Sequence, residues 1–133
     1  PRQRPDLAIH KFACLMLAGE PIPFFGDGST RRDYTYIDDI VQGVRAAIDY
    51  EATQYEIINL GNCRTVSLSE LVQALERIFG IKARIERLPA QPGDVPQTWA
   101  DVSKAEQLLG FRVRTKFLQG LQRFADWMDS SSK

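Results

Sequence analysis

Apolar residues recur every three or four positions along five stretches of the chain, and this spacing predicts five helices. The clearest stretch begins at Ser67, which forms a capping-box pattern with Glu70, and ends before Gly80. Its apolar face consists of Leu68, Leu71, Val72, Leu75, Ile78 and Phe79. The pattern therefore predicts an amphipathic helix over 67–79.

The other four stretches carry weaker helix signals. Asp6 can serve as the N-cap of the first, with Gly19 as its stop. Asp38 and Asp39 open the second, where carboxylates favour the positive end of the helix dipole. Asp101 can cap the third, which is short. The predicted helices span 6–18, 38–48, 101–109 and 117–127.

Short runs of β-branched, aromatic or alternating residues predict strands. Prolines restrict the run 21–25 to an edge or isolated strand, and 31–37 is a short extended piece after a turn whose glycines can adopt positive φ. The run 56–61 is predicted as a short strand, and 82–87 as a half-exposed one. We expect an α+β fold of helices packed on short strands, since the sequence lacks the long strand–helix alternation and the GxGxxG loop of a Rossmann domain.

Composition places the chain among ordinary soluble globular domains. It has 133 residues, 44% hydrophobic and 26% charged, which allows one modest core. The 17 basic and 17 acidic residues cancel, which argues against a nucleic-acid partner because phosphate neutralisation needs a basic face. No apolar run approaches transmembrane length, so no membrane partner is expected. We expect residues 1–129 to form one region and 130–133 a disordered tail.

The cysteines and the histidine form no recognisable catalytic or metal site. Cys14 and Cys63 lack the spacing of metal ligands. A disulfide between them stays open, but free thiols in a cytoplasmic protein are the simpler interpretation. His10, the single histidine, lies on a mainly apolar helix and is interpreted as a partly buried structural residue. No Ser/His/Asp or Cys/His pairing is visible, so no catalytic residue is predicted.

Three polar segments could bind an anionic ligand. Arg2 and Arg4 lie between prolines and could recognise a carboxylate or phosphate, although a solvated basic end is the alternative. In 26–34 a glycine-rich turn precedes an arginine pair that could reach a diphosphate, and the alternative is a turn with a surface Arg–Asp pair. In 91–96 a rigid loop offers an acceptor carboxylate to sugar or ribose hydroxyls, and the alternative is a plain turn.

These segments, in this order, resemble a known family. The matching stretches are PRQRPDLA (1–8), FGDGSTRRDYTYIDDI (25–40), NLG (59–61) and QPGDVPQTWAD (91–101). They are similar to the NAD-dependent nucleotide-sugar epimerases and dehydratases of the extended short-chain dehydrogenase/reductase family. The opening segment and Gln91 resemble the branch that epimerises UDP-glucuronate at C4.

The resemblance implies a mechanism that this chain only partly contains. Such enzymes oxidise the sugar at C4 with tightly bound NAD, rotate the keto intermediate and return the hydride to its other face. Their Tyr-xxx-Lys base and Gly-rich cofactor loop precede the matching segments. The chain therefore resembles the C-terminal substrate-binding part of an isomerase of carbohydrate metabolism, without its N-terminal Rossmann domain. We expect this part alone to bind no NAD and to be inactive, and the full-length, NAD-containing enzyme to be a cytoplasmic homodimer.

The resemblance also implies substrate-binding roles, with UDP-glucuronate or UDP-galacturonate as the ligand. Arg4 would hold the uronate carboxylate and Arg32 the diphosphate. Gln91 stands where UDP-galactose 4-epimerases usually carry arginine, so it can offer only a weaker, uncharged hydrogen bond. Asp94 belongs to the same loop, which meets the phosphate or ribose. The segment Ile22, Pro23 and Phe24 matches one beside the uracil, and Ile9 matches a residue that lines the nucleotide pocket.

Two alternatives stay open. A nucleotide-sugar dehydratase or decarboxylase of the same family would share these segments. A non-catalytic structural domain is the other possibility. If the chain normally packs on a cofactor domain, it should expose an apolar patch and tend to self-associate.

Overall fold

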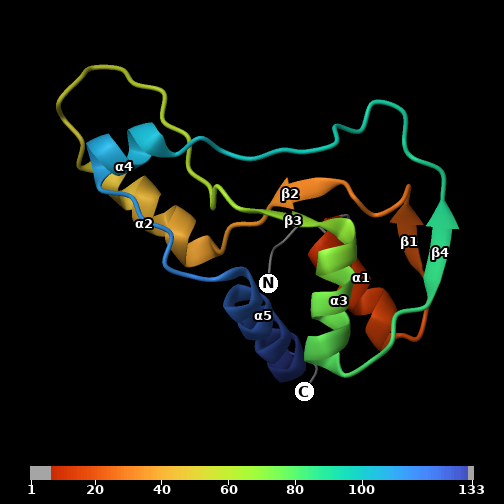
Figure 1. Cartoon of the computed structure of the whole chain (residues 1–133). Helices are drawn as coiled ribbons and strands as arrows, with labels where there is room; N and C mark the ends of the chain where they lie inside the picture. Colours follow the sequence, from red (N-terminus) through yellow and green to blue (C-terminus); the bar gives the residue numbers. More distant parts are fainter. Residues whose placement is uncertain (1–6, 132–133) are drawn as a thin grey trace.

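The fold, a computed structural model, is described here for residues 7–131, which form five helices and four short strands (Figure 1). In chain order the elements are α1 Ala8–Leu17, β1 Ile22–Phe25, β2 Arg31–Asp33, α2 Ile37–Ile48, β3 Thr65–Ser67, α3 Leu68–Phe79, β4 Ile85–Leu88, α4 Ser103–Leu109 and α5 Phe117–Ser131. The α+β fold class expected from the sequence is confirmed.

The strands form two separate pairs. β1 and β4 are parallel, with Ile22 opposite Ile85 and Phe24 opposite Arg87. β2 and β3 are antiparallel, with Arg31 opposite Ser67. Both pairs join segments that are distant in sequence, so they fix the positions of the loops that leave them. One of these loops runs from β4 to residue 97, where a single bridge pairs Gln97 with Arg31 of β2.

The main core lies where α1, α3 and α5 pack together with β1. It contains Phe12, Met16, Ile22, Phe24, Leu71, Val72, Ala74, Leu75 and Leu121. A second, smaller core of Val102, Ala105 and Phe111 lies beside α2 and α4, toward the other end of the molecule (Figure 1). The sequence predicted one core, and the structure divides it into two.

The amphipathic helix predicted over 67–79 is confirmed, together with its capping box. The hydroxyl of Ser67 accepts the Glu70 N–H at 3.0 Å, and the Glu70 carboxylate accepts the Ser67 N–H at 2.7 Å. Gly80 follows with φ 66°, a left-handed conformation that suits a residue without Cβ. The other four predicted helices are also present, with small differences at their ends.

Three of those helix boundaries are corrected. α1 begins after Leu7 with no side-chain cap, and the predicted N-cap Asp6 lies outside the described residues. α2 starts at Ile37, one residue before the predicted start. The Asp101 carboxylate accepts the Ser103 N–H at 3.0 Å, but it stands one residue ahead of the N-cap position.

Two further expectations are corrected. α5 continues through Ser131, so the tail expected to be disordered from residue 130 is helical for its first two residues. The strand predicted over 56–61 is not formed, because none of the described strands pairs with it. A strand needs a hydrogen-bonded neighbour to exist as one. Nearby, Tyr55 and Ile57 are 80% and 66% exposed.

None of the described helices combines the length and the apolarity that a membrane span requires.

Candidate functional site

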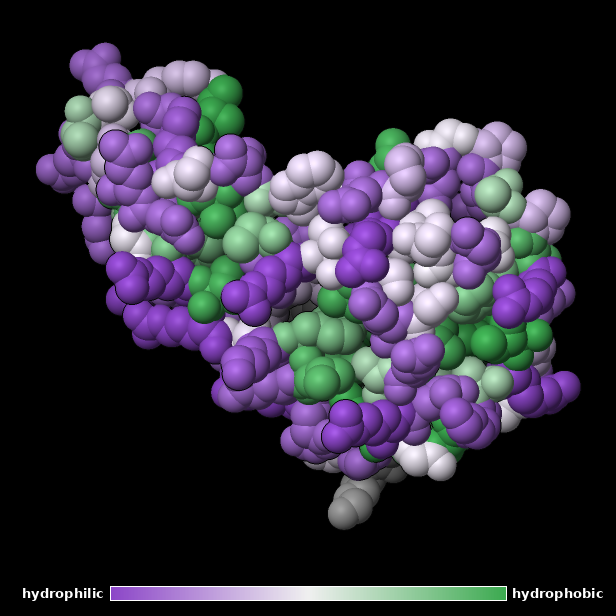
Figure 2. All heavy atoms as spheres, viewed as in Figure 1, coloured by the Kyte–Doolittle hydropathy of each residue, from purple (hydrophilic) through white to green (hydrophobic). Residues whose placement is uncertain are grey.

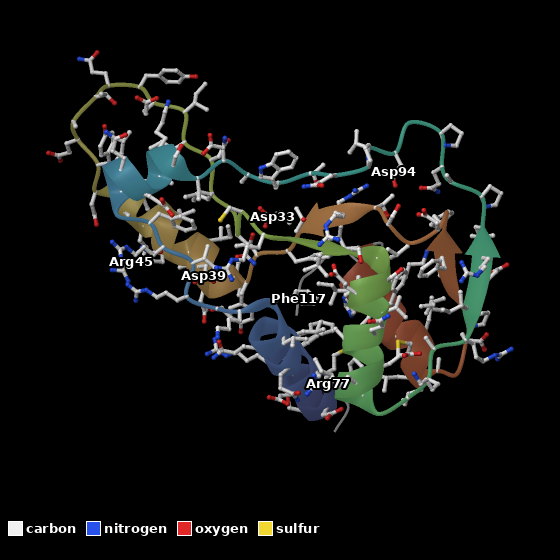
Figure 3. The ribbon with its side chains drawn as sticks, viewed as in Figure 1. Asp33, Asp39, Arg45, Arg77, Asp94 and Phe117 are labelled. Atoms are coloured by element: carbon white, nitrogen blue, oxygen red, sulfur yellow. The ribbon has the colours of Figure 1, made fainter. Side chains whose placement is uncertain are left out.

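Arg32 of β2 joins two of the three polar segments singled out in the sequence. Its Nη2 forms an ion pair with Asp94 of the 91–96 loop. Its Nη1 donates to the Val95 carbonyl at 2.9 Å and to the Arg31 carbonyl at 2.8 Å. The side chains of Arg32 and Asp94 remain 30% and 36% exposed. Figure 3 shows Asp94 in this loop, beyond β2. The result is an accessible cation held against a loop rich in exposed polar groups.

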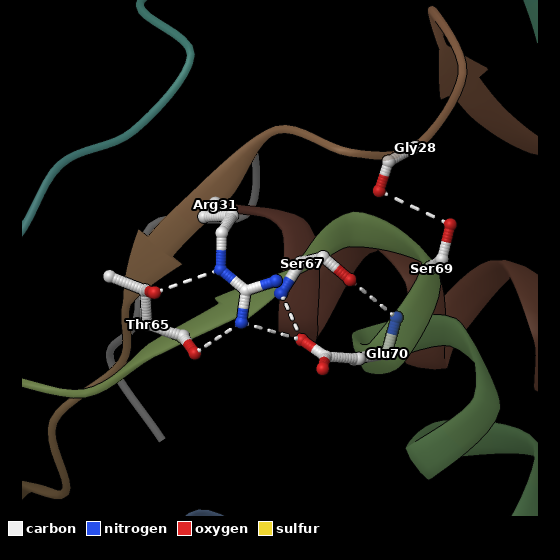
Figure 4. Close-up of polar contacts among 6 residues, drawn as sticks. All are labelled: Gly28, Arg31, Thr65, Ser67, Ser69 and Glu70. Atoms are coloured by element: carbon white, nitrogen blue, oxygen red, sulfur yellow. Dashed lines mark hydrogen bonds and ion pairs between the residues drawn. The ribbon is translucent and has the colours of Figure 1, made fainter.

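Arg31, the neighbouring residue, serves the scaffold. Its Nε donates to the Thr65 hydroxyl at 2.9 Å, and its Nη2 donates to the Thr65 carbonyl at 2.9 Å and to Glu70 at 3.0 Å (Figure 4). Its backbone also holds the loop, because its N–H donates to the Pro96 carbonyl at 2.8 Å. The two consecutive arginines therefore have different roles: Arg31 stabilises the scaffold and Arg32 contacts the 91–96 loop. The sequence pattern did not distinguish them.

The pKa of the Glu70 carboxyl is lowered, first by the hydrogen bond from the Ser67 backbone and in smaller part by the Arg31 guanidinium. Glu70 thus links the capping box of α3 to Arg31 of β2, and its negative charge strengthens the contact with the guanidinium.

The glycine turn over 26–30 packs tightly on the scaffold. Gly28 has φ 84°, and a Cβ placed there would lie 2.3 Å from both the Phe24 ring and the Ser69 hydroxyl. Its carbonyl accepts the Ser69 N–H at 3.1 Å and the Ser69 hydroxyl at 3.2 Å. Asp27 accepts the Ser29 hydroxyl at 2.6 Å and the Ser29 N–H at 2.9 Å, which lowers the pKa of its carboxyl. The turn is therefore closely tied to β1 and to the start of α3.

Asp33 organises the other end of β2. Its carboxylate accepts backbone N–H groups from Asn62 at 2.9 Å, Cys63 at 3.0 Å and Ala100 at 3.2 Å, and the Thr35 hydroxyl at 3.1 Å. These bonds hold the 61–63 and 98–100 segments together around a polar hollow of about 380 Å³. Sequence reasoning missed this role. The signal available was an acidic residue between two arginines and a run of aromatic and β-branched residues.

β1 contains the segment predicted to lie beside the uracil, and alternate side chains of this strand are buried. Ile22 is fully buried and Phe24 is 4% exposed, so their side chains belong to the core. The backbone offers more. The Ile22 N–H donates to the carbonyl of Arg84, just before β4, at 2.8 Å, and the Gly26 N–H donates to the Leu88 carbonyl of β4 at 2.9 Å. Because bonding direction alternates along a strand, the backbone polar groups of Pro23 and Phe25 point to the opposite edge. None of the described strands pairs with that edge.

Two of the remaining predicted site residues, Gln91 and Ile9, line different parts of the surface. Gln91 is exposed in the same loop as Asp94, and its carbonyl accepts the Asp94 N–H at 3.1 Å. Ile9 is half-buried on α1 and lines a different hollow. Arg4 lies outside the described residues.

That second hollow is a large apolar groove of about 760 Å³. It lies between the start of α2 and the inner face of α5, and its lining includes Ile9, Tyr34, Ile40, Phe117, Phe124 and Trp127. Hydrophobic residues reach the surface over α5 in Figure 2. On α2 itself, Ile37, Val41, Val44 and Ile48 are between 47% and 75% exposed. The expected apolar patch is therefore present.

His10 and the cysteines agree with their structural interpretation. His10 is half-buried, and its ring meets Phe124 and Trp127 edge-on at 5.8 and 6.2 Å. Its Nδ1 is buried without a hydrogen-bond partner. Cys14 and Cys63 are both free and exposed. Within residues 7–131 no cluster of three or more His, Cys, Asp or Glu side chains could hold a metal ion.

Comparison with known proteins bears on these residues. A family model described as GDP-mannose 4,6 dehydratase matches residues 1–124. A UDP-glucuronate 4-epimerase from Thermodesulfobacterium geofontis is 41% identical over 128 residues, which cover 96% of this chain and 39% of the relative.

Solved structures give the same picture. The UDP-glucuronic acid 4-epimerase from Bacillus cereus, in complex with UDP-glucuronic acid and NAD, is 38% identical with a TM-score of 0.87, covering 98% of this chain and 42% of that one. A UDP-glucose 4-epimerase from Thermotoga maritima, with UDP-glucose, is 30% identical with a TM-score of 0.89 over 100% of this chain and 43% of that one. The chain spans about two fifths of the length of the relatives it matches.

Proposed function

The chain belongs to the NAD-dependent nucleotide-sugar epimerase and dehydratase family of extended short-chain dehydrogenases, and from that premise we propose that it is the sugar-nucleotide-binding part of a UDP-glucuronate 4-epimerase. The single observation that carries the proposal is the Arg32 site. It combines an accessible guanidinium with an adjacent polar loop, and guanidinium groups suit the oxygens of a diphosphate.

In this proposal Arg32 binds the diphosphate, and Gln91 and Asp94 approach the phosphate or ribose from the loop. The uracil lies along the free edge of β1. There the Phe25 N–H and the Pro23 and Phe25 carbonyls can offer one donor and two acceptors. Ile9 would line the nucleotide pocket.

The acidic sugar calls for a further cation, and Arg4 is proposed for that role from the sequence. Selection of a uronate over a neutral hexose would rest on this charge–charge contact. The relatives whose names include UDP-glucuronate favour this branch over the dehydratases.

The described residues do not fit NAD. Among residues 7–131 no Gly-rich loop opens a helix, and the first N–H groups of α3 already have acceptors: the Thr30 and Gly28 carbonyls and the Ser67 hydroxyl. We propose that the cofactor, the base and the hydride transfer belong to an N-terminal Rossmann domain. That domain would cover the apolar groove and the exposed face of α2, and the chain alone would be inactive.

Calorimetric titration of the chain with UDP and UDP-glucuronate tests the binding proposal. Heat of binding should be lost in Arg32→Ala and retained in Arg45→Ala, which removes an exposed arginine of α2 away from the 91–96 loop (Figure 3). No heat at millimolar ligand would favour a purely structural domain.

A second test uses the full-length enzyme loaded with NAD. Interconversion of UDP-glucuronate and UDP-galacturonate supports the proposal, whereas turnover of UDP-glucose alone contradicts the uronate assignment and Arg4 with it.

A further inference from the structure

The outer face of α2 carries an apolar stripe that points away from the rest of the chain. The stripe consists of Ile37, Val41, Val44 and Ile48, which are between 47% and 75% exposed. At about 100° per residue these four positions fall within about 60° of one another around the helix. The buried residues of α2, Asp39 and Gly43, lie on the opposite side. The helix therefore uses one side for its own core and leaves the stripe for a partner.

The spacing of the stripe is the same when it is read from either end, because its members are four, three and four residues apart. If two copies of α2 run antiparallel about a two-fold axis, Ile37 lies opposite the partner's Ile48 and Val41 opposite the partner's Val44. A two-fold interface requires this self-complementarity, since the same surface must fit itself.

The charges beside the stripe are complementary in the same arrangement. Asp38 and Arg45 lie on one flank of α2, and Ile40 and Ala47 lie on the other flank. Antiparallel pairing brings the charged flanks together, with Arg45 displaced by only about 3 Å along the axis from the partner's Asp38. Parallel pairing would set the charged flank of one copy against the apolar flank of the other. The charges therefore favour the antiparallel direction.

Both charged side chains are available for this contact. The Asp38 side chain is 70% exposed, and its ion pair with Arg123 of α5 is long, at 3.6 Å. Arg45 is exposed and has no ion-pair partner within residues 7–131. Exposed ion pairs contribute little to stability, so Asp38 can turn to a second cation at small cost.

The apolar groove extends the same surface. Ile37 and Ile40 belong to its lining, so the partner's Ile48, opposite Ile37, enters the groove at its α2 side. The two-fold axis repeats this contact at the other end of the helix pair. Burial of apolar area supplies the attraction, and the charges fix the direction and register.

We propose that two copies of this chain pair through α2 in an antiparallel, two-fold arrangement. The face is the one assigned above to an N-terminal domain, so pairing and docking of that domain exclude each other. The Arg32 site lies on β2, outside the stripe, and takes no part in the pairing. Because α2 has only 12 residues, the interface is small, and we expect a dissociation constant on the order of 100 µM.

Charge reversal tests the pairing on the 133-residue chain. Asp38→Arg and Arg45→Asp each place like charges where the two copies meet. Each should weaken the dimer about five-fold or more at low ionic strength, because both symmetry-related ion pairs are lost. Arg77→Asp is the matched control, since Arg77 is also an exposed arginine in the last turn of a helix, α3, away from α2 (Figure 3). It should leave the constant unchanged. Sedimentation equilibrium measures the constants, and circular dichroism checks that each variant is folded.

Mixing the two single variants gives the sharper measurement. Asp38→Arg has only positive charges on the flank and Arg45→Asp has only negative ones. An equimolar mixture should therefore form a heterodimer more tightly than either variant forms a homodimer. The double variant Asp38→Arg/Arg45→Asp should recover the wild-type constant to within about two-fold. A substitution that only damaged the fold would not be rescued in either way.

A wild type that stays monomeric up to about 1 mM overturns the pairing and leaves the stripe to the N-terminal domain. A dimer that neither charge reversal weakens, or that mixing does not restore, overturns the α2 geometry. Both results leave UDP binding at Arg32 untouched, so the pairing can fail while the proposed function stands.

Discussion

The carboxylate of Asp39, at the start of α2, accepts the backbone N–H of Thr115, 76 residues later, at 3.1 Å. It also accepts the Arg114 N–H at 3.0 Å, and Asp39 itself is only 3% exposed. This one side chain therefore attaches the segment before α5 to α2.

Replacing Asp39 should destabilise the fold strongly. Asp39→Ala leaves two backbone N–H groups without their acceptor, and an unsatisfied buried donor costs about 1–3 kcal/mol. Asp39→Asn retains one acceptor oxygen and should lose less. Urea unfolding followed by circular dichroism measures both, and an unchanged midpoint for Asp39→Ala would contradict the assignment.

Gly28 and Gly93 offer a matched pair, because both have nearly the same backbone angle, φ 84° and 83°. A Cβ at Gly28 would lie 2.3 Å from the Phe24 ring, whereas a Cβ at Gly93 would meet nothing within 4 Å. Both alanine variants bear the cost of a left-handed residue, about 1–2 kcal/mol. Gly28→Ala should lose about 1–3 kcal/mol more through overpacking. Equal thermal stabilities of the two variants would rule out the tight packing of this turn.

Stability should fall in acid partly through Glu70. The pKa of its carboxyl is lowered from the ordinary 4.5, first by the Ser67 N–H. A lowered pKa in the folded state means that its stabilising contribution is present above about pH 4.5 and is lost as the pH falls through the folded value. Glu70→Gln can still accept the Ser67 N–H and so should keep the cap. Because glutamine does not titrate, the stability of this variant should fall less steeply in acid (a flatter acid limb).

Glu70→Ala removes both the charge and the cap acceptor. Comparison with Glu70→Gln, which removes only the charge, therefore separates the two contributions. Its stability should be lower than that of Glu70→Gln at neutral pH, with the same flattened acid limb. Denaturation midpoints of the three proteins are compared between pH 3 and pH 7, the span around the ordinary pKa of 4.5. If stability falls as steeply in acid for Glu70→Gln as for the wild type, the role of the Glu70 charge is contradicted.

The isolated chain should self-associate through α2. Val44 is 47% exposed within an apolar stripe of that helix, and Leu118 is 48% exposed but lies on α5, outside that stripe. Val44→Lys should reduce association several-fold, because an ammonium group is strongly hydrated, and Leu118→Lys should have a smaller effect. Sedimentation velocity at several concentrations measures this. A wild type that stays monomeric at high concentration would count against the exposed patch as an association site.

The elements that the sequence predicted well are those decided by local chemistry. The capping box of Ser67 and Glu70 and the stop at Gly80 depend on residues within one helix, so they could be seen without the fold. The strand over 56–61 could not be judged in this way, because a strand depends on a partner that pattern alone does not supply.

The candidate site was predictable in its segments but not in its contacts. The pattern placed Arg32 and Asp94 in separate polar segments, and only the fold brings them together. It did not distinguish Arg31 from Arg32, because both are arginines in one short strand with opposite tasks. The sequence predicted that Asp39 interacts favourably with the positive end of the α2 dipole. In the structure its carboxylate instead accepts backbone N–H groups of Arg114 and Thr115, far along the chain.

The parallel pairing of β1 with β4 has a kinetic consequence. The two strands are parallel and are separated in the chain by β2, α2, β3 and α3, so their pairing closes a long loop. Asp33 and Ala100, 67 residues apart, impose the same requirement. Closing such long loops costs entropy before any contact is gained. We therefore expect α3, with its strong local signals, to form early, and the two strands and their loops to join it late and together.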